Sequence, residues 1–234
     1  MFSYFITGTD TNIGKTLVSC ALLNALSKKR KGVVGMKPIA TGCHETPDGL
    51  LSEDVEKLRA ASDIKAHLSL VNPYAFIPPI APHIAAQLTK TKIDLTVIHE
   101  AFKQLQNMAE AVIVEGIGGF KVPIDVRATT IDIVRTLQLP IILVVGVKLG
   151  CLNHALLTLD AIHSSRLRLE AWVANCIDPS MELVEENIKT LQQRIPAPLL
   201  GTIPFTQNLT PQKAASHLDI YRLSEIQIKS GPTF

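Results

Sequence analysis

The chain has 234 residues, of which 47% are apolar and 19% are charged, and its formal net charge is +2. This composition predicts a folded protein with a sizeable apolar core and excludes an intrinsically disordered chain. The small net charge gives no reason to expect nucleic acid or an anionic membrane as a partner.

Strand and helix patterns alternate along the chain. We expect strands at Phe2–Thr7, Val33–Lys37, Ala111–Glu115, Pro140–Gly146, Leu169–Asn175 and Leu199–Ile203. Helices are expected at Gly14–Lys29, Glu53–Ala61, Asp94–Met108, Thr129–Leu137, Asn153–His163 and Met181–Arg194, and the proline-rich stretch Pro73–Pro82 is expected to be a loop. Several strands are apolar at successive positions, which is typical of strands buried on both faces of a parallel sheet. The pattern predicts one α/β domain over residues 1–234, a doubly wound, mainly parallel sheet with helices on both faces.

The first strand runs into a glycine-containing turn, GTDTNIGKT at residues 8–16, and then into a helix. Backbone N–H groups at such a turn, together with the helix N-terminus, form a cradle for phosphate groups. In this motif Gly14 lets the backbone approach the phosphates closely, Lys15 reaches the β- and γ-phosphates, and the Thr16 hydroxyl binds magnesium. The first glycine, Gly8, stands one residue further from Gly14 than the usual spacing. The alternative interpretation is a glycine turn with an incidental lysine.

Charged residues lie at the ends of two other expected strands. Glu115 ends the run Ala111–Glu115, where a solvated surface charge is hard to accommodate, so it is a candidate magnesium or nucleotide contact. Lys37 ends the second strand and is a candidate stabiliser of a transferring phosphoryl group, although strand-end lysines often only reach into water. Asp54 is a further candidate, or it belongs to the first turn of a helix. Glu115, likewise, has a structural alternative as a capping carboxylate.

The strand at Pro140–Gly146 leads through Gly150 into another helix. A glycine turn at a helix N-terminus is a second possible anion site. Two such sites would suit a substrate that carries a carboxylate, used together with a nucleotide. An ordinary strand-to-helix turn is the alternative.

Four cysteines, Cys20, Cys43, Cys151 and Cys176, show neither C-x-x-C spacing nor a zinc-ligand pattern. The N-terminus lacks the features of a signal peptide, and no apolar stretch reaches the roughly 20 residues that span a bilayer. We therefore expect free thiols, no membrane partner and a cytoplasmic location.

Taken together, these segments resemble the dethiobiotin synthetase family. The matching stretches are GTDTNIGKT (8–16), GMKPIATG (35–42), VNPYAF (71–76), APH (81–83), VEGIGG (114–119), PIILVVGVKLGCLNHALLT (140–158), WVAN (172–175) and PAPLLGTIPF (196–205). The resemblance covers about residues 1–205 in the family's order and spacing. It implies a P-loop enzyme that uses ATP and Mg²⁺ to join CO2 to 7,8-diaminopelargonate. A carbamate and a carbamic-phosphoric mixed anhydride would precede ring closure to dethiobiotin, with ADP and phosphate as the other products.

The resemblance also implies a role for individual residues. Lys15, Lys37 and Thr11 would be catalytic, and Thr16, Asp54 and Glu115 would hold magnesium. Thr41 and Gly118 would line the diamine site, and the helix start Gly150, Cys151, Leu152 and Asn153 would bind the substrate carboxylate from the partner subunit of a homodimer. The nucleotide would contact Asn12, Ile13, Gly14, Lys15, Thr16, Leu17, Asp54, Glu115, Gly116, Ile117, Gly118, Asn175, Cys176, Pro204, Phe205, Thr206 and Pro211.

Two positions depart from the family pattern, and a third separates the chain from a related class of P-loop ATPases. Thr41 stands where serine is expected and keeps the hydroxyl, and Asn12 stands where an acid is common. The alternative class is the ParA- and MinD-like dimeric ATPase switches, and Asp10 occupies the place of their signature lysine. Such switches usually also carry an amphipathic membrane tail or a basic DNA-binding patch, and this sequence shows neither. An amide-forming ligase with a glutaminase domain is a further alternative that 234 residues leave no room for. The match fades after Phe205, so residues 206–234 are expected to be a peripheral segment.

Overall fold

A computed structural model describes residues 2–223 of the chain, so Met1 and the end of the expected peripheral segment (224–234) lie outside the described residues. Its centre is a six-stranded sheet in the order β10-β9-β8-β1-β7-β2. All pairs in this sheet are parallel. The strands are β1 (Phe2–Gly8), β2 (Val33–Met36), β7 (Ala111–Glu115), β8 (Ile141–Val147), β9 (Leu169–Cys176) and β10 (Leu199–Ile203). The first strand of the chain therefore lies in the interior of the sheet, between β7 and β8.

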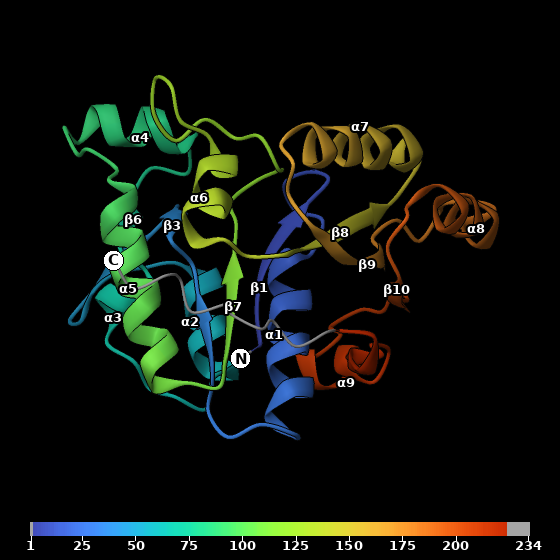
Figure 1. Cartoon of the computed structure of the whole chain (residues 1–234), viewed down its shortest axis with the longest axis horizontal. Coiled ribbons are helices and arrows are strands. Elements are labelled where there is room, and N and C mark those ends of the chain that lie inside the picture. The colour runs from blue at the N-terminus through green and yellow to red at the C-terminus, as the bar shows by residue number, and fades with distance from the viewer. Residues whose placement is uncertain (1, 224–234) are drawn as a thin grey trace, which may run out of the picture.

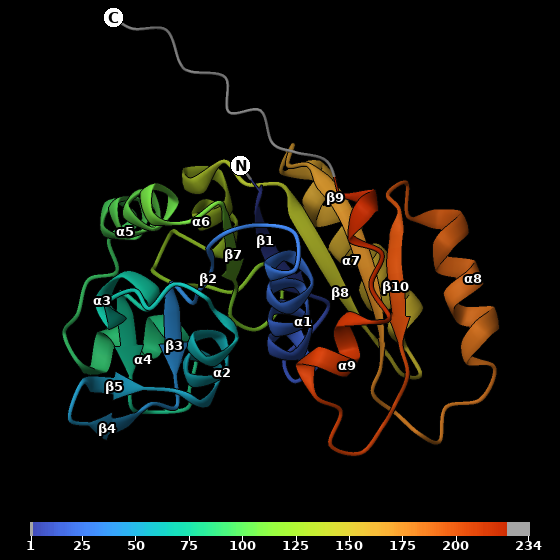
Figure 2. The same cartoon turned by 90° about the horizontal axis from the view of Figure 1, so that it is seen from below.

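Helices cover both faces of this sheet (Figures 1 and 2). One face packs against α1 (Lys15–Ser27), α2 (Glu53–Ala61) and α9 (Pro211–Ala215), with Tyr4 and Ile6 of β1 pointing toward them. The other face packs against α5 (Leu95–Met108), α6 (Thr130–Leu137), α7 (Cys151–Ser164) and α8 (Val184–Arg194). Because helices bury both faces of the sheet, side chains that point to either face are removed from water, and the strands are apolar at successive positions. The prediction of a doubly wound, parallel α/β fold is confirmed.

Local sequence explains where several helices begin. The Asp94 carboxylate accepts a hydrogen bond from Thr96 N at 2.8 Å and so caps α5. Ser52 accepts from Val55 N at 3.3 Å at the start of α2, and Thr129 and Asp132 form a capping box at α6. Each cap satisfies backbone N–H groups that have no partner in the first helical turn.

The six expected strands and six expected helices are present, with ends that shift by up to three residues. The structure adds short elements that the sequence did not indicate: β3 (Ile39–Thr41), β4 (His44–Thr46), β5 (Gly49–Leu51), β6 (Tyr74–Phe76), α3 (Leu68–Val71), α4 (Pro82–Leu88), α9 and the 3₁₀ turn Ile220–Arg222. The expectation that Pro73–Pro82 is only a loop was wrong, because β6 pairs in parallel with β3 and α4 begins at Pro82. The four cysteines are free thiols. None of the helices within residues 2–223 combines the length and the apolar character that crossing a bilayer requires.

Candidate active site

The phosphate loop connects β1 to α1 at the carboxyl edge of the sheet. Gly14 has φ 85°, and Asn12 also has a positive φ of 57°. Behind the loop, the buried Asn175 of β9 donates a hydrogen bond from Nδ2 to the Ile13 carbonyl at 2.7 Å. A Cβ on Gly14 would lie 2.2 Å from that Asn175 nitrogen, so the glycine is required by both its backbone angle and its neighbour.

Lys15 follows the loop and is almost fully buried, with 7% of its surface exposed. Its Nζ donates to the Asp10 carbonyl at 2.8 Å, which folds the side chain back along the loop. Burial lowers the pKa of Lys15 to about 8, and repulsion from Lys37 adds to that shift. A phosphate anion placed at Lys15 would reverse it, because an opposite charge favours the ammonium form.

Lys37 lies just after β2 and is the centre of a buried charge cluster. Its Nζ is 2.6 Å from Glu115 Oε1 and 2.7 Å from Asp54 Oδ2, and it donates to the Gly116 carbonyl at 3.1 Å. Burial alone would lower the pKa of Lys37, but attraction to Glu115 and Asp54 outweighs it and the pKa is raised. Lys37 is therefore a fixed ammonium group held at the ends of β2 and β7.

Three oxygen-bearing side chains converge beside this cluster. Thr16 Oγ1 lies 2.8 Å from Asp54 Oδ1 and 2.9 Å from Glu115 Oε1. Glu115 Oε2 is buried without a hydrogen-bond partner among the described residues, which is costly for a carboxylate oxygen. Hard oxygen ligands of this kind are what Mg²⁺ prefers, and a bound cation would satisfy the orphaned oxygen. Thr16, Asp54 and Glu115 thus fit the magnesium ion that a P-loop enzyme uses.

A cavity of about 500 Å³ opens above these groups. Half of the residues expected at the site line it, namely Thr11, Asn12, Gly14, Lys15, Thr16, Leu17, Lys37, Thr41, Asp54, Glu115, Ile117 and Gly118. Three lining residues were missed by sequence reasoning: Ala40, Glu53 and Lys57. Lys57 follows Asp54 by one helical turn and could have been found from that spacing; it pairs with Glu53 at 2.6 Å.

Other expected residues lie outside the lining of this cavity. Ile13 is buried beneath the loop, and Gly116 offers its carbonyl to Lys37. Cys176 ends β9, Pro204, Phe205 and Thr206 are exposed after β10, and Pro211 begins α9. The start of α7 lies after β8, where Gly150 has φ 91°, Cys151 is buried and Asn153 is exposed. Within the described residues of one chain, the lining of the cavity includes neither the residues that follow β9 and β10 nor the start of α7.

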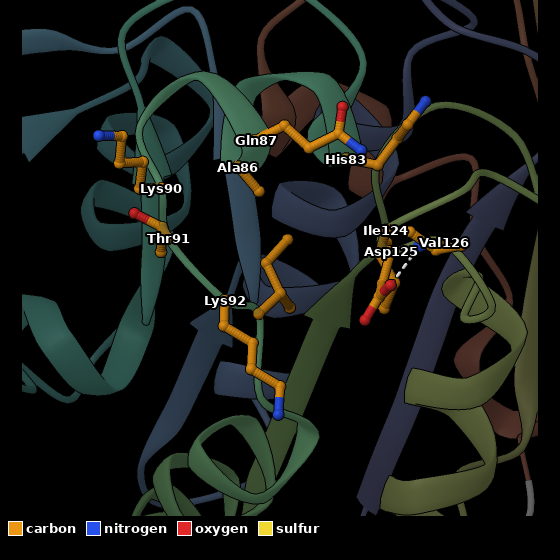
Figure 3. A pocket seen from close by; sticks show the side chains of 10 residues that line it. His83, Ala86, Gln87, Lys90, Thr91, Lys92, Ile124, Asp125 and Val126 are labelled. Atoms are coloured by element: carbon orange, nitrogen blue, oxygen red, sulfur yellow. Dashed lines mark hydrogen bonds between the residues drawn. The ribbon is translucent and has the colours of Figure 1, made fainter.

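A second cavity, of about 250 Å³, lies between α4 and the loop that follows β7 (Figure 3). His83 and Gln87 border it from α4, and Asp125 and Val126 border it from the loop, where the Asp125 carboxylate accepts a hydrogen bond from Val126 N. None of the described residues that line this cavity also lines the first one. The charge cluster and the phosphate loop belong to the first cavity alone.

Comparisons with known proteins give the family and the fold of the chain. Residues 3–213 match a family model described as an AAA domain. Among solved structures, the MinC:MinD cell division protein complex of Aquifex aeolicus has a TM-score of 0.54 at 16% identity, covering 94% of this chain and 88% of that chain. A ParA family ATPase from Chlorobium tepidum TLS has a TM-score of 0.53 at 13% identity, covering 94% and 92%. The fold and the loop after β1 define a P-loop nucleotide-binding α/β protein.

Sequence relatives place the chain within that class. The ATP-dependent dethiobiotin synthetase BioD of Nitrosospira multiformis is 49% identical over 94% of this chain and 96% of its own length. The protein of the same name from Aromatoleum aromaticum is 47% identical over 92% and 96%. The chain belongs to the dethiobiotin synthetase family and is an ATP-dependent ligase. The suspected family is therefore confirmed, and the switch ATPases share only its fold.

Proposed function

We propose that this enzyme converts 7,8-diaminopelargonate, CO2 and ATP into dethiobiotin, ADP and phosphate. The observation that carries the proposal is the convergence of two lysines, two carboxylates and Thr16 on one cavity beside a phosphate loop. The names of the relatives supply the reaction, and the cavity supplies groups that such a reaction needs. Mg²⁺ bound by Thr16, Asp54 and Glu115 would neutralise phosphate charge.

Three bond-forming steps make up the proposed reaction. One amine of the substrate attacks the carbon of CO2 and loses a proton, which gives a carbamate. A carbamate oxygen then attacks the γ-phosphorus of ATP, and ADP leaves. Finally the second amine attacks the carbonyl carbon of the mixed anhydride and loses a proton, phosphate leaves, and the ureido ring closes. No side chain has to act as a nucleophile, so positioning and charge stabilisation carry the catalysis.

The two lysines at the phosphate site and other residues that line the cavity have a place in this scheme. The Lys37 ammonium stabilises negative charge on the carbamate and on the phosphoryl group, because Glu115 and Asp54 hold it fixed before substrate binds. Lys15 binds the phosphates once it leaves the Asp10 carbonyl. Thr11, Thr41 and Gly118 line the same cavity, and we place the amines and the carbamate beside them.

The remaining assignments concern the edges of the site. We place the adenine near Asn175, Cys176 and the exposed segment Pro204–Thr206, with Pro211 at its border. The substrate carboxylate would bind the start of α7 in the partner subunit of a homodimer, at Gly150–Asn153. Support comes from an exposed apolar residue beside that helix start, since Leu149 is 89% exposed. A second copy of the chain would cover it.

Phosphate release tests the proposal directly. Purified protein is given ATP, Mg²⁺ and bicarbonate, with and without 7,8-diaminopelargonate, and dethiobiotin is sought by mass spectrometry. We expect phosphate release that requires the diamine, and a fall in kcat of about 100- to 1000-fold in Lys37→Ala, as for loss of a charge-stabilising donor. Lys103→Met, an exposed lysine on α5, is the matched control and should keep wild-type activity. Phosphate release that is indifferent to the diamine would contradict the proposed substrate.

A further inference from the structure

Asp10 makes three different contacts within and beyond the phosphate loop. Its main-chain carbonyl accepts the hydrogen bond from Lys15 Nζ at 2.8 Å. One carboxylate oxygen, Oδ1, accepts from Thr11 N at 2.7 Å. The other, Oδ2, lies 3.5 Å from Lys148 Nζ. One residue thus contacts both lysine and threonine of the candidate active site and a cation from another strand end.

Lys148 belongs to the turn that begins α7. It follows the last residue of β8, and its carbonyl accepts a hydrogen bond from Cys151 N at 2.9 Å, which closes the turn before the helix. A backbone hydrogen bond already connects the end of β1 to β8, because Thr9 N donates to the Val144 carbonyl at 3.0 Å. The contact between Asp10 and Lys148 extends this connection beyond the sheet.

The surroundings of the Asp10 carboxylate favour its charged form. The hydrogen bond from Thr11 N lowers the pKa of Asp10, and the charges of Lys148 and His154 lower it further. Both partners are partly exposed, with 46% of the Asp10 side chain and 37% of the Lys148 side chain accessible. An ion pair of this exposure contributes little to overall stability, so its value would lie in local geometry.

We infer that Asp10 and Lys148 are positioning residues that hold the phosphate loop, with Thr11 and Lys15, against the turn that begins α7. The inference deepens the proposed function, on which it rests for the roles of Thr11 and Lys15. It connects the nucleotide-binding end of β1 to the helix start proposed for the substrate carboxylate. Neither residue has to touch the reacting atoms, because Asp10 acts on the loop through the hydrogen bond from Thr11 N, and its carbonyl holds Lys15 only until phosphates bind.

ADP binding in the presence of Mg²⁺, measured by calorimetry, tests the inference in four proteins: wild type, Asp10→Asn, Lys148→Met and the double variant. Asparagine keeps an oxygen for Thr11 N but loses the attraction to Lys148. We expect each single variant to bind ADP about two- to fivefold more weakly, the value of one exposed ion pair. The double variant should bind no more weakly than the weaker single variant, because both changes break one interaction.

Two further variants separate positioning from simple charge. Lys148→Arg keeps the cation and should restore wild-type affinity, and Lys103→Met removes a distant exposed lysine and should leave affinity unchanged. If Asp10 acted only through its charge, removing it would tighten ADP binding, since one repulsion of the phosphates is lost. Tighter binding by Asp10→Asn, or additive losses in the double variant, would overturn the inference.

The ADP measurement does not depend on the diamine. Wild-type protein is assayed in parallel for diamine-dependent phosphate release. Absence of that release, with a non-additive ADP cycle, contradicts the proposed substrate and leaves the positioning role intact. Normal release with an additive cycle contradicts the positioning role alone.

Discussion

The two sides of β1 differ in what they bury at the carboxyl edge of the sheet. On the side of β7 and β2, the strands lead into Glu115 and Lys37, two buried charges in contact with each other. On the side of β8 and β9, the strand β8 is buried along its whole length and carries only apolar residues and glycine. The charged side chains that line the cavity beyond the phosphate loop lie on the first side, and on the second side Asn175 of β9 supports the loop.

The difference extends to the chain that connects the strands. Between β2 and β7 the crossover includes four short strands and four helices, and it contributes Thr41 and Asp54 to the cavity. Between β8 and β10 each crossover is a single helix, either α7 or α8. Loops and small elements on a sheet are where functional side chains are usually found, and here this crossover supplies Thr41 and Asp54 to the lining of the cavity.

The largest expected effect is that a substitution on the β8 side lowers the free energy of unfolding without lowering kcat, whereas Lys37→Ala lowers kcat. Leu143 of β8 is fully buried and pairs in register with Thr7 and Trp172. Leu143→Ala should lower the free energy of unfolding by about 2–5 kcal/mol through loss of apolar contact and the cavity left behind. Its kcat per folded molecule should stay near wild type, in contrast to Lys37→Ala.

Chemical denaturation and steady-state assays at a temperature where both variants are folded make this comparison. Met108→Ala, at a half-exposed position that ends α5, is the control and should change stability by much less. A loss of kcat in Leu143→Ala as large as in Lys37→Ala would show that the two sides are not separate in function.

A smaller effect tests how the supporting side reaches the nucleotide. Asn175→Ala removes the hydrogen bond to the Ile13 carbonyl and should weaken ATP binding about 2- to 10-fold. Because that bond supports the loop and not the base, GTP binding should weaken by the same factor. Titrations with both nucleotides measure this, with Asn187→Ala on the surface of α8 as the control. A loss confined to ATP would instead place the Asn175 amide at the adenine.

The smallest expected effect is the uptake of a fraction of a proton by Lys15 when nucleotide binds. The pKa of Lys15 is about 8 in the free protein, mainly because of burial, and phosphate should raise it. Nucleotide binding near pH 8 should therefore take up protons, and the uptake should fade at lower pH, where Lys15 is already charged. Calorimetry in buffers of different ionisation enthalpy measures the uptake. It should be absent in Lys15→Gln, and proton release by the wild type would contradict the assignment.

The sequence predicted the regular side of the fold well and the irregular side poorly. Long apolar strands such as Ile141–Val147 and the loop at residues 8–16 have strong local patterns. The strands β3 and β6 have three residues each, too few to show a periodicity, and they depend on each other for pairing. Glu115 could be predicted because a charged residue at the end of a buried strand is rare. Lys37 was a candidate because it ends a strand near the phosphate loop, and the sequence left open whether it only reaches into water.

Contacts between distant segments set the limit of the prediction. The hydrogen bond from Asn175 to Ile13 and the pair of Asp10 with Lys148 join residues that are far apart in sequence. No local spacing encodes them. The resemblance to a family named residues of the site, but it did not reveal that Asn175 faces the back of the phosphate loop.

The interior position of β1 has a consequence for how the protein is made. A ribosome releases β1 and the phosphate loop well before their partners, because β1 gains its neighbour β7 only after residue 115 and its neighbour β8 only after residue 147. Until then an apolar strand with unpaired backbone groups is present in the nascent chain, which is the kind of segment that invites wrong pairing. The loop then still lacks Asn175, so a segment that is synthesised early gains its last supporting hydrogen bond only after residue 175 has been released.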